Sequence, residues 1–313
     1  MKLLNDKFDF YSPFNFSTYS LGQTMRYQLQ VLENLDHLTH RHSENVANLT
    51  CRICEYLGFE KNLILYTTMC AYLHDIGKIF IPHHILKKNG KLTDEEYEIM
   101  KQHTVYGYNL CKNDPKLKMF ADGALYHHEC LDGSGYPNGL SGNEIPMSAQ
   151  IIHVADVFDA LVTKRCYTTH VDISKTLQDM IKESHPSSNL IALDNLRSNN
   201  KGKVNKKVLR TLFKVVIDDT QYEIYSNKEY IRSLKDEVSR LEQVQEFDRA
   251  RKKKTSPKSK EYYENGMKLL LKSDETFDNY TSVLYDFKTA IKDKTELINQ
   301  LYQEIKILKK LKV

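Results

Sequence analysis

The sequence predicts a helical protein with a histidine-rich centre, and three observations support this prediction. Between residues 25 and 218, apolar side chains recur at helical spacing, with turns at Gly58, at Asn89-Gly90 and in a glycine-rich segment around Gly135. Beyond residue 219, the pattern changes to long helices. Groups of histidine and aspartate are widely separated along the chain, and helix bundles bring such residues together by directing side chains inward from several facing helices.

Shifts in composition divide the chain into three parts. Residues 1–24 are a short aromatic arm, which is too short for a sensor domain. Residues 25–218 are expected to form the main domain, with a polar insertion rich in Ser, Asn and Lys at about 184–203. Residues 219–313 are expected to form an antiparallel helical hairpin or coiled coil.

The C-terminal helices contain an apolar seam that can close within one chain or between two. It consists of Phe277, Tyr280, Leu284, Phe287, Ile291, Ile298, Leu301, Ile305 and Leu308. We therefore expect self-association or docking of a partner protein. Segment 249–260, RARKKKTSPKSK, is expected to be a basic tip between helices. Such a cluster can bind nucleic acid or an anionic membrane, but without interleaved aromatic residues a solvated loop is favoured and nucleic acid is not expected.

Charge, hydrophobicity and cysteine content limit the classes of protein to which the chain can belong. The 313 residues have a net charge of +4 and 27% charged residues, which gives no global argument for nucleic-acid binding. The chain has no apolar run long enough to span a membrane and no signal-peptide pattern, so a cytoplasmic protein is expected. The six cysteines are expected to be free thiols, and the lone CxxC pair, Cys51 and Cys54, is expected to pack in the core.

Two motifs predict the chemistry of the main domain. The segment AYLHDIGK contains the adjacent pair His74-Asp75, and the segment HHECLDGSGYP begins with His127-His128. Imidazole and carboxylate are ligands for intermediate divalent metals, and the two oxygens of an aspartate can bridge two ions. Further candidate ligands are His42, His103 and Asp156. The sequence therefore predicts a bimetallic site.

Two divalent ions about 3.5 to 4 Å apart can share a hydroxide and direct it at a phosphodiester phosphorus. Lys78, one helical turn after His74, is expected to supply positive charge to the phosphate. Gly133, Gly135 and Pro137 are expected to shape a loop beside the histidine pair. In that loop, Tyr136 could contact a guanine base or a phosphate, or it could simply pack the loop.

The motifs resemble those of the HD-GYP subgroup of the HD metal-dependent phosphohydrolases. The matching segments are HSENVA, HDIGKIFIP, GKLTDEEYEIMKQH, HHECLDGSGYPNGLSGNEIP and AQIIHVADVFDALVTKRCY, in family order, over about residues 25–218. The resemblance implies an all-α fold, an HD-type helical bundle with a bimetallic centre, and phosphodiesterase activity on cyclic di-GMP.

Carried over residue by residue, the resemblance implies two groups of ligands. One metal would be held by His42, His74, Asp75 and Asp156. Asp75 would bridge to a second metal held by His103, His127 and His128. Both ions are expected to be iron or manganese, which suit ligands of this kind.

Two positions depart from the family pattern. Some members bind a third metal through a glutamate four residues before the first histidine, and Leu38 stands there in this chain, so two metals are expected. Cys166 replaces the proline of an RPY segment, whereas Arg165 and Tyr167 are kept. The resemblance implies that both contact the substrate, together with Lys78 and the loop residues Gly135, Tyr136 and Pro137. His83 and His84 follow HDIGKIFIP, but they are left outside the ligand set.

The predicted function is hydrolysis of cyclic di-GMP to linear pGpG, to GMP, or to both, by attack of a hydroxide that bridges the metals. Two alternatives remain open at this point. The substrate could be another cyclic dinucleotide, such as cyclic GMP-AMP, or another phosphoester. The chain could instead be a catalytically silent nucleotide receptor that signals through the C-terminal coil, although a receptor has no need of a complete bimetallic centre.

Overall fold

The computed structural model describes residues 37–165, 173–184 and 202–311. The arm at 1–24, Tyr167 and most of the polar insertion therefore lie outside the described residues, and so do the side chains of Leu38 and Arg165. The described residues form helices and no named strand, and Asp132 and Ser141 form one isolated bridge. The all-α fold expected from the sequence is confirmed for this part of the chain. Contacts divide the chain into two compact units, at 1–215 and 216–310.

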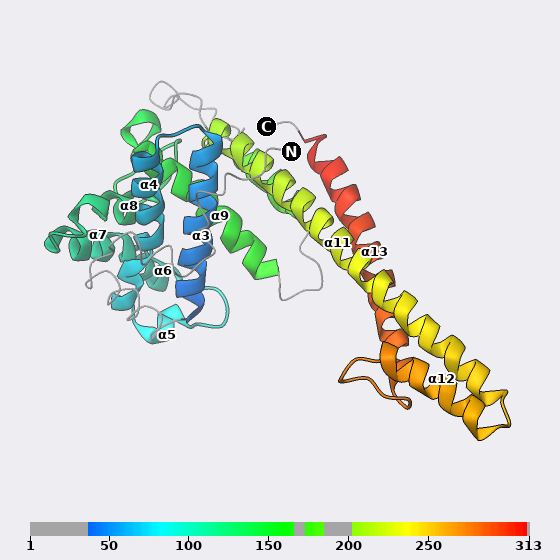
Figure 1. Ribbon diagram of the computed structural model, residues 1–313. Helices are drawn as coiled ribbons and strands as arrows, with labels where there is room; N and C mark the ends of the chain where they lie inside the picture. Colours follow the sequence, from blue (N-terminus) through cyan, green and yellow to red (C-terminus); the bar gives the residue numbers. More distant parts are fainter. Residues whose placement is uncertain (1–36, 166–172, 185–201, 312–313) are drawn as a thin grey trace. The chain divides into compact units, whose positions relative to one another are not determined.

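The first unit is a bundle of short and medium helices (Figure 1). Its elements are α3 (His37–Tyr56), α4 (Lys61–Leu73), η1 (Ile76–Phe80), α5 (His83–Leu86), α6 (Asp94–Lys101), α7 (His103–Asn113), η2 (Lys118–Phe120), α8 (Ala121–Tyr126), η3 (Gly142–Glu144), α9 (Met147–Arg165) and α10 (Ile173–Glu183). Helix α11 (Lys206–Lys252) begins in this unit and continues into the second.

Helix α4 is the centre of the first unit. Every residue from Thr67 to Leu73 is buried, and the helix contacts α3, α8 and α9. Because α4 is apolar on nearly all sides, it has no solvent face over these turns, which is typical of a helix enclosed in a core. The His74-Asp75 pair follows directly after α4, so the core helix ends at the polar centre of the bundle.

A close approach of two backbones fixes the position of the segment after α4. A Cβ added to Gly77 would lie 2.0 Å from the carbonyl oxygen of His103 and 2.4 Å from the nitrogen of Gly107. No other residue fits between η1 and α7 without displacing one of them. This contact places the start of α7, and therefore His103, beside the turn that contains Asp75.

Helix α6 is held by its cap rather than by the core. The Thr93 hydroxyl accepts a hydrogen bond from Glu96 N, and the Glu96 carboxylate accepts one from Thr93 N, which forms a capping box. Asp94, Glu95 and Glu96 add negative charge to the first turn, where the helix dipole favours it. None of the residues of α6 is buried.

The cysteines of the first unit are packing residues. Cys51, Cys54, Cys70 and Cys111 are buried free thiols, and Cys130 is a half-buried one. Burial raises the pKa of Cys51 and of Cys54 to about 12, so both stay protonated at neutral pH.

The second unit contains three helices, so the expected two-helix hairpin gains an additional helix. These are α11, α12 (Pro257–Leu270) and α13 (Tyr280–Leu308). Leu241, Val244, Met267, Tyr280 and Leu284 form one core cluster, and Ile224, Ile298, Leu301 and Ile305 form another. The apolar seam of α13 therefore packs on helices of the same chain.

The predicted basic tip, residues 249–260, covers the end of α11, the turn that follows it and the start of α12. Helix α11 ends at Lys252, and Pro257 starts α12 at a position where its missing N–H is not needed. Two cations of the basic tip form ion pairs with neighbouring acids. Arg251 contacts Asp248 and Glu264, and Lys252 contacts Asp248. Among the described residues, no helix is both long and apolar enough to cross a membrane.

Candidate metal centre

The structure brings together all seven residues that the sequence predicts as metal ligands. His42 lies on α3, His74 and Asp75 follow α4, His103 begins α7, His127 and His128 follow α8, and Asp156 lies on α9. In three overlapping groups, the candidate ligand atoms lie within 4.8 Å of one another. The groups are His42, His74 and Asp75; His74, His127 and Asp156; and His103, His127 and His128.

The two carboxylate oxygens of Asp75 face different histidines. Oδ2 lies 3.3 Å from His74 Nε2 and 3.8 Å from His42 Nε2. Oδ1 lies 3.4 Å from His103 Nε2 and 3.9 Å from His127 Nε2. A carboxylate in this position can give one oxygen to each of two ions.

Asp156 completes the group that includes His42. Its Oδ1 lies 3.0 Å from His42 Nε2 and 4.0 Å from His74 Nε2, and its Oδ2 lies 3.9 Å from His128 Nδ1. It therefore reaches both sides of the cluster from α9, the helix that contacts α3 and α4.

Backbone carbonyls set the tautomers of three histidines. His74 Nδ1 lies 2.6 Å from Ala71 O, His103 Nδ1 lies 2.7 Å from Met100 O, and His127 Nδ1 lies 3.0 Å from Ala124 O. A carbonyl oxygen only accepts, so each Nδ1 carries the proton and, in the neutral ring, each Nε2 presents a lone pair. The Nε2 atoms of His103 and His127 are 3.3 Å apart, so one divalent ion bound by both lone pairs would remove the repulsion between them.

The charges of the cluster follow from burial and from its neighbours. Burial lowers the pKa of His103 and, more strongly, the pKa values of His127 and His128, so these rings are neutral at pH 7. Burial alone would raise the pKa of Asp75, but the charges of Lys78 and His74 outweigh it and hold that pKa well below its usual range. Burial is likewise outweighed at Asp156, whose pKa is lowered by the hydrogen bond with His42.

These residues fit a pair of divalent ions. His74 Nε2 and Asp75 Oδ1 are buried atoms with no hydrogen-bond partner, and both point into the cluster. Leaving such atoms unpaired costs free energy, which a metal ligand bond removes. The ligand set of imidazoles and carboxylates suits iron, manganese and similar ions.

Lys78 lies beside the bridging carboxylate. Its Nζ is 2.6 Å from Asp75 Oδ2, and its side chain is 21% exposed. The ammonium group can therefore balance the charge of Asp75, and its partial exposure is compatible with the contact to a phosphate that the sequence predicts.

Two residues of the centre were missed by sequence reasoning. Asp159 Oδ2 accepts a 2.6 Å hydrogen bond from His42 Nδ1 and so orients that ring. Its position three residues after Asp156 on a helix was the available signal. His153, which the sequence leaves outside the ligand set, donates from Nδ1 to the carbonyl oxygen of His127 at 2.8 Å.

The second missed residue, Glu129, holds the glycine-rich loop. The carboxylate of Glu129 is buried and accepts hydrogen bonds from Asn138 N at 2.7 Å and from Leu140 N at 2.9 Å. Gly133 has a φ of +82°, and a Cβ on Gly135 would lie 2.3 Å from Cys130 N. The first glycine therefore supplies a left-handed turn, and the second permits a close backbone contact.

The tyrosine of this loop packs on a candidate ligand. The rings of Tyr136 and His128 are stacked, with centroids 4.7 Å apart and an angle of 29° between the planes. Pro137 is exposed. His83 and His84 on α5 are also exposed, and neither belongs to a ligand group.

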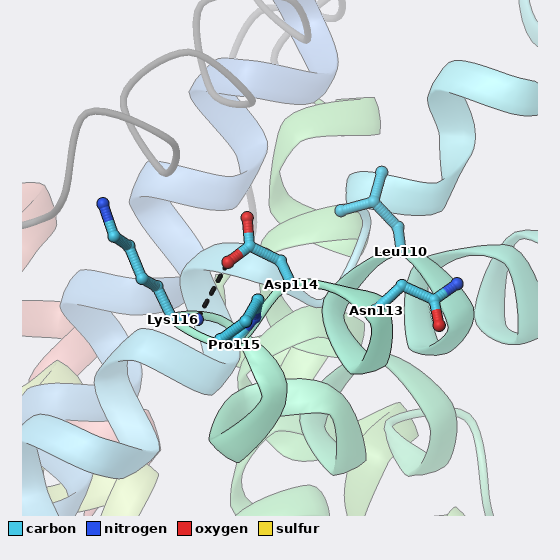
Figure 2. Close-up of a pocket in the computed structure, with 5 residues that line it drawn as sticks. All are labelled: Leu110, Asn113, Asp114, Pro115 and Lys116. Carbon is cyan, nitrogen blue, oxygen red and sulfur yellow. Dashed lines mark hydrogen bonds between the residues drawn. The ribbon is translucent and has the colours of Figure 1, made fainter.

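A surface depression lies at the end of α7, and none of the candidate metal ligands line it. Leu110, Asn113, Asp114, Pro115 and Lys116 line it, and Asp114 Oδ1 accepts a hydrogen bond from Lys116 N at 2.8 Å (Figure 2). It contains none of the predicted site residues, and we assign it no role.

Several curated proteins are similar to part of this chain. A cyclic di-GMP phosphodiesterase of Thermotoga maritima is 48% identical over 153 residues, which cover 48% of this chain and 40% of that protein. The cyclic di-GMP phosphodiesterase response regulator RpfG of Xanthomonas campestris is 41% identical, over 46% of this chain and 39% of that protein. A 3'3'-cGAMP-specific phosphodiesterase 3 of Vibrio cholerae is 38% identical, over 47% of this chain and 32% of that protein.

The chain spans less than half the length of these curated relatives. A sequence model described as an HD domain matches residues 26–186, which are about half of the chain and include all seven candidate ligands. The chain therefore belongs to the HD domain family, and its motifs are those of the HD-GYP subgroup that the sequence resembles.

Proposed function

We propose that this chain is a metal-dependent phosphodiesterase that hydrolyses cyclic dinucleotides, with cyclic di-GMP as the favoured substrate. The observation that supports it most directly is Asp75, whose two oxygens face two different sets of histidines at 3.3 to 3.9 Å. A receptor that only binds a nucleotide gains nothing from such a bridge. The names of the relatives support the same class of activity.

Two bound divalent ions would supply an activated water and neutralise the charge that develops on the phosphate. The residues of the chain have separate tasks around them. Asp75 and Asp156 stay ionised, because their pKa values are lowered, and so present anionic oxygens to the ions. Lys78 adds a positive charge beside Asp75, where a phosphate oxygen gains charge during the reaction.

The candidate substrates within this class are chemically similar cyclic dinucleotides. Curated relatives act on cyclic di-GMP and on 3'3'-cGAMP, and both contain at least one guanine and two phosphodiester bonds. We favour cyclic di-GMP, with pGpG, GMP, or both as products, because two of the three relatives are named for it.

A panel of cyclic dinucleotides tests the proposal directly. Metal-reconstituted protein is incubated with cyclic di-GMP, cyclic GMP-AMP and cyclic di-AMP, and the products are separated by chromatography. We expect turnover that is highest with cyclic di-GMP. Tight binding of cyclic di-GMP by wild-type protein without any cleavage would contradict the proposed enzyme and indicate a receptor. Higher turnover of cyclic GMP-AMP than of cyclic di-GMP would contradict the favoured substrate.

We also infer that the C-terminal helices mediate self-association or bind a partner protein. The seam of α13 is closed within the chain, so the contact surface is provided by exposed side chains. Tyr222 and Tyr225 on α11 are 61% and 51% exposed, and Tyr285 on α13 is 69% exposed. Light scattering on the full chain should show a dimer that Tyr285→Glu weakens. A monomer at all concentrations would contradict self-association and leave only the binding of a partner protein as the proposed role.

A further inference from the structure

An array of aromatic rings leads from a candidate metal ligand to the surface of the protein. The ring of His128 stacks on Tyr136, and the edge of Tyr97 meets Tyr136 with centroids 6.4 Å apart and an angle of 80° between the planes. Tyr97 lies on α6, which has no buried residue, and its side chain is 48% exposed. Core packing therefore does not explain why an aromatic residue stands at this position.

The ring of Tyr136 is already in use. One neighbour is His128, another is Tyr97, and the ammonium of Lys101 lies 5.8 Å from its centroid. Tyr136 is half-buried among them. The tyrosine of the glycine-rich loop thus supports a candidate ligand, and Tyr97, which contacts it, offers an exposed aromatic ring.

Lys101 is placed to hold this open ring and to contact a ligand above it. Its Nζ lies 5.5 Å from the centroid of Tyr97, within the range of a cation–π contact. It also pairs with Glu98 at 2.5 Å, but the Glu98 side chain is 66% exposed. Exposed ion pairs contribute little, so the ammonium can turn towards a bound ligand at small cost.

We propose that Tyr97 and Lys101 form a subsite for a purine base of the substrate, next to the metal centre. This inference rests on the proposed function, because it takes a cyclic dinucleotide as the ligand. The base stacks on the open face of Tyr97, and Lys101 donates hydrogen bonds to its edge. Stacking on an aromatic side chain accepts any base, since every base has a π face.

The ammonium adds a preference among bases. Guanine presents two acceptors, N7 and O6, on one edge, whereas adenine presents one acceptor and an amino donor there. A lysine has donors only, so it favours guanine over adenine. Tyr97 therefore contributes affinity for the base, and Lys101 contributes selectivity for guanine.

The kinetic constants of three variants test this subsite. Tyr97→Ala removes the ring, and the KM for cyclic di-GMP should rise between roughly fivefold and a hundredfold, the range for loss of one stacked base. The kcat should stay close to wild type, because stacking is the same in the ground state and the transition state. Tyr97→Phe keeps the ring and should restore the wild-type KM. Lys101→Met should narrow the ratio of kcat/KM between cyclic di-GMP and cyclic di-AMP.

Two controls separate the subsite from the metal centre and from general damage. Inorganic phosphate has no base, so its inhibition constant should be the same for wild type and for Tyr97→Ala. Tyr262→Ala removes an exposed tyrosine of the second unit that belongs to no proposed binding surface, and it should leave the KM unchanged. Circular dichroism shows whether each variant is folded.

The outcomes distinguish the two proposals. Wild-type protein that cleaves cyclic di-GMP, with an unchanged KM in folded Tyr97→Ala, overturns the subsite and leaves the phosphodiesterase in place. A fall in kcat together with weaker phosphate inhibition also overturns it, because the effect then passes through the metal centre. If wild-type protein cleaves no cyclic dinucleotide, the proposed function fails, and the subsite fails with it.

Discussion

At the scale of single residues, Asp75 connects the two halves of the proposed metal centre. Its oxygens are the atoms that lie between the His42–His74 side and the His103–His127 side. Asp75→Ala removes this connection, so both ions lose a shared ligand, and hydrolysis should fall by orders of magnitude. Lys78→Ala removes one charge near the phosphate and should reduce kcat much less. Chromatography of the products measures both, and wild-type cleavage by folded Asp75→Ala would contradict the mechanism.

The pKa of His42 is shifted in the opposite direction to those of His103, His127 and His128. Burial lowers its pKa, but hydrogen bonds with Asp156 and Asp159 outweigh burial and raise it to about 10. In the metal-free protein, the bonded imidazolium contributes stability that is fully present below the unfolded pKa of about 6.5. This contribution decreases as pH rises from there through 10. A metal must displace the same proton, so metal affinity should increase over this window.

The displaced proton gives a direct measurement. At pH 8, His103, His127 and His128 are already neutral, because their pKa values are lowered, whereas His42 is still protonated. Loading with metal should therefore release about one proton per chain from His42. Titration calorimetry in two buffers with different ionisation enthalpies counts the released protons. A count near zero would show that His42 is neutral before the metal binds.

Asp159 is the positioning residue for His42, because it accepts the hydrogen bond from Nδ1. Asp159→Asn should weaken metal binding by roughly 10- to 100-fold, which is typical for loss of such a partner. It should also reduce the number of protons released at pH 8, because it removes one of the bonds that raise the pKa of His42. A change in stability without either effect would mean that Asp159 is only structural.

At the scale of elements, the glycine-rich loop depends on one buried carboxylate. Glu129 accepts the N–H groups of Asn138 and Leu140, and Glu129→Ala leaves both without this acceptor. Unfolding of the metal-free variant in urea should show a loss of about 2 kcal/mol or more. Glu144→Ala is the matched control. It removes an exposed carboxylate that bonds Ser141, and its cost should be smaller. Equal losses would mean that burial of Glu129 is not decisive.

At the scale of the whole molecule, metal and fold should depend on one another. The candidate ligands lie on α3, α7 and α9 and directly after α4 and α8, so ions bound at the cluster would link most of the first unit. We expect elemental analysis to find about two ions per chain, iron or manganese, because Leu38 cannot provide a third site. A chelator should lower the Tm of the first unit, since metal binds the folded state. Three full sites, or none after reconstitution, would contradict the ligand assignment.

The sequence by itself determined the types of residue at the centre and their order along the chain. His74-Asp75 and His127-His128 stand in long motifs, and such motifs identify a family before any contact is known. Helical periodicity predicted helical segments along the chain, since the spacing of apolar residues directly reflects which face of a helix is buried, and the family resemblance implied the all-α fold. The same spacing predicted the heptad seam from Phe277 onward. It did not predict whether the seam would be covered by the same chain or by a second one.

Only the tertiary structure decided which side chains meet. Glu129 bonds backbone groups that lie 9 and 11 residues away, and Asp159 bonds His42, which is 117 residues away. The spacing of Asp159 from Asp156 could suggest that both lie on one face of a helix, but it does not show that Asp159 meets His42, because that contact depends on how α3 and α9 pack. The contacts of Glu129 depend on how the loop folds back on itself, which the spacing of apolar residues does not reveal. The same holds for Tyr97, which is an ordinary exposed residue of α6 until Tyr136 and Lys101 are seen beside it. Packing also closed the seam of α13 within the chain, since its buried residues contact α11.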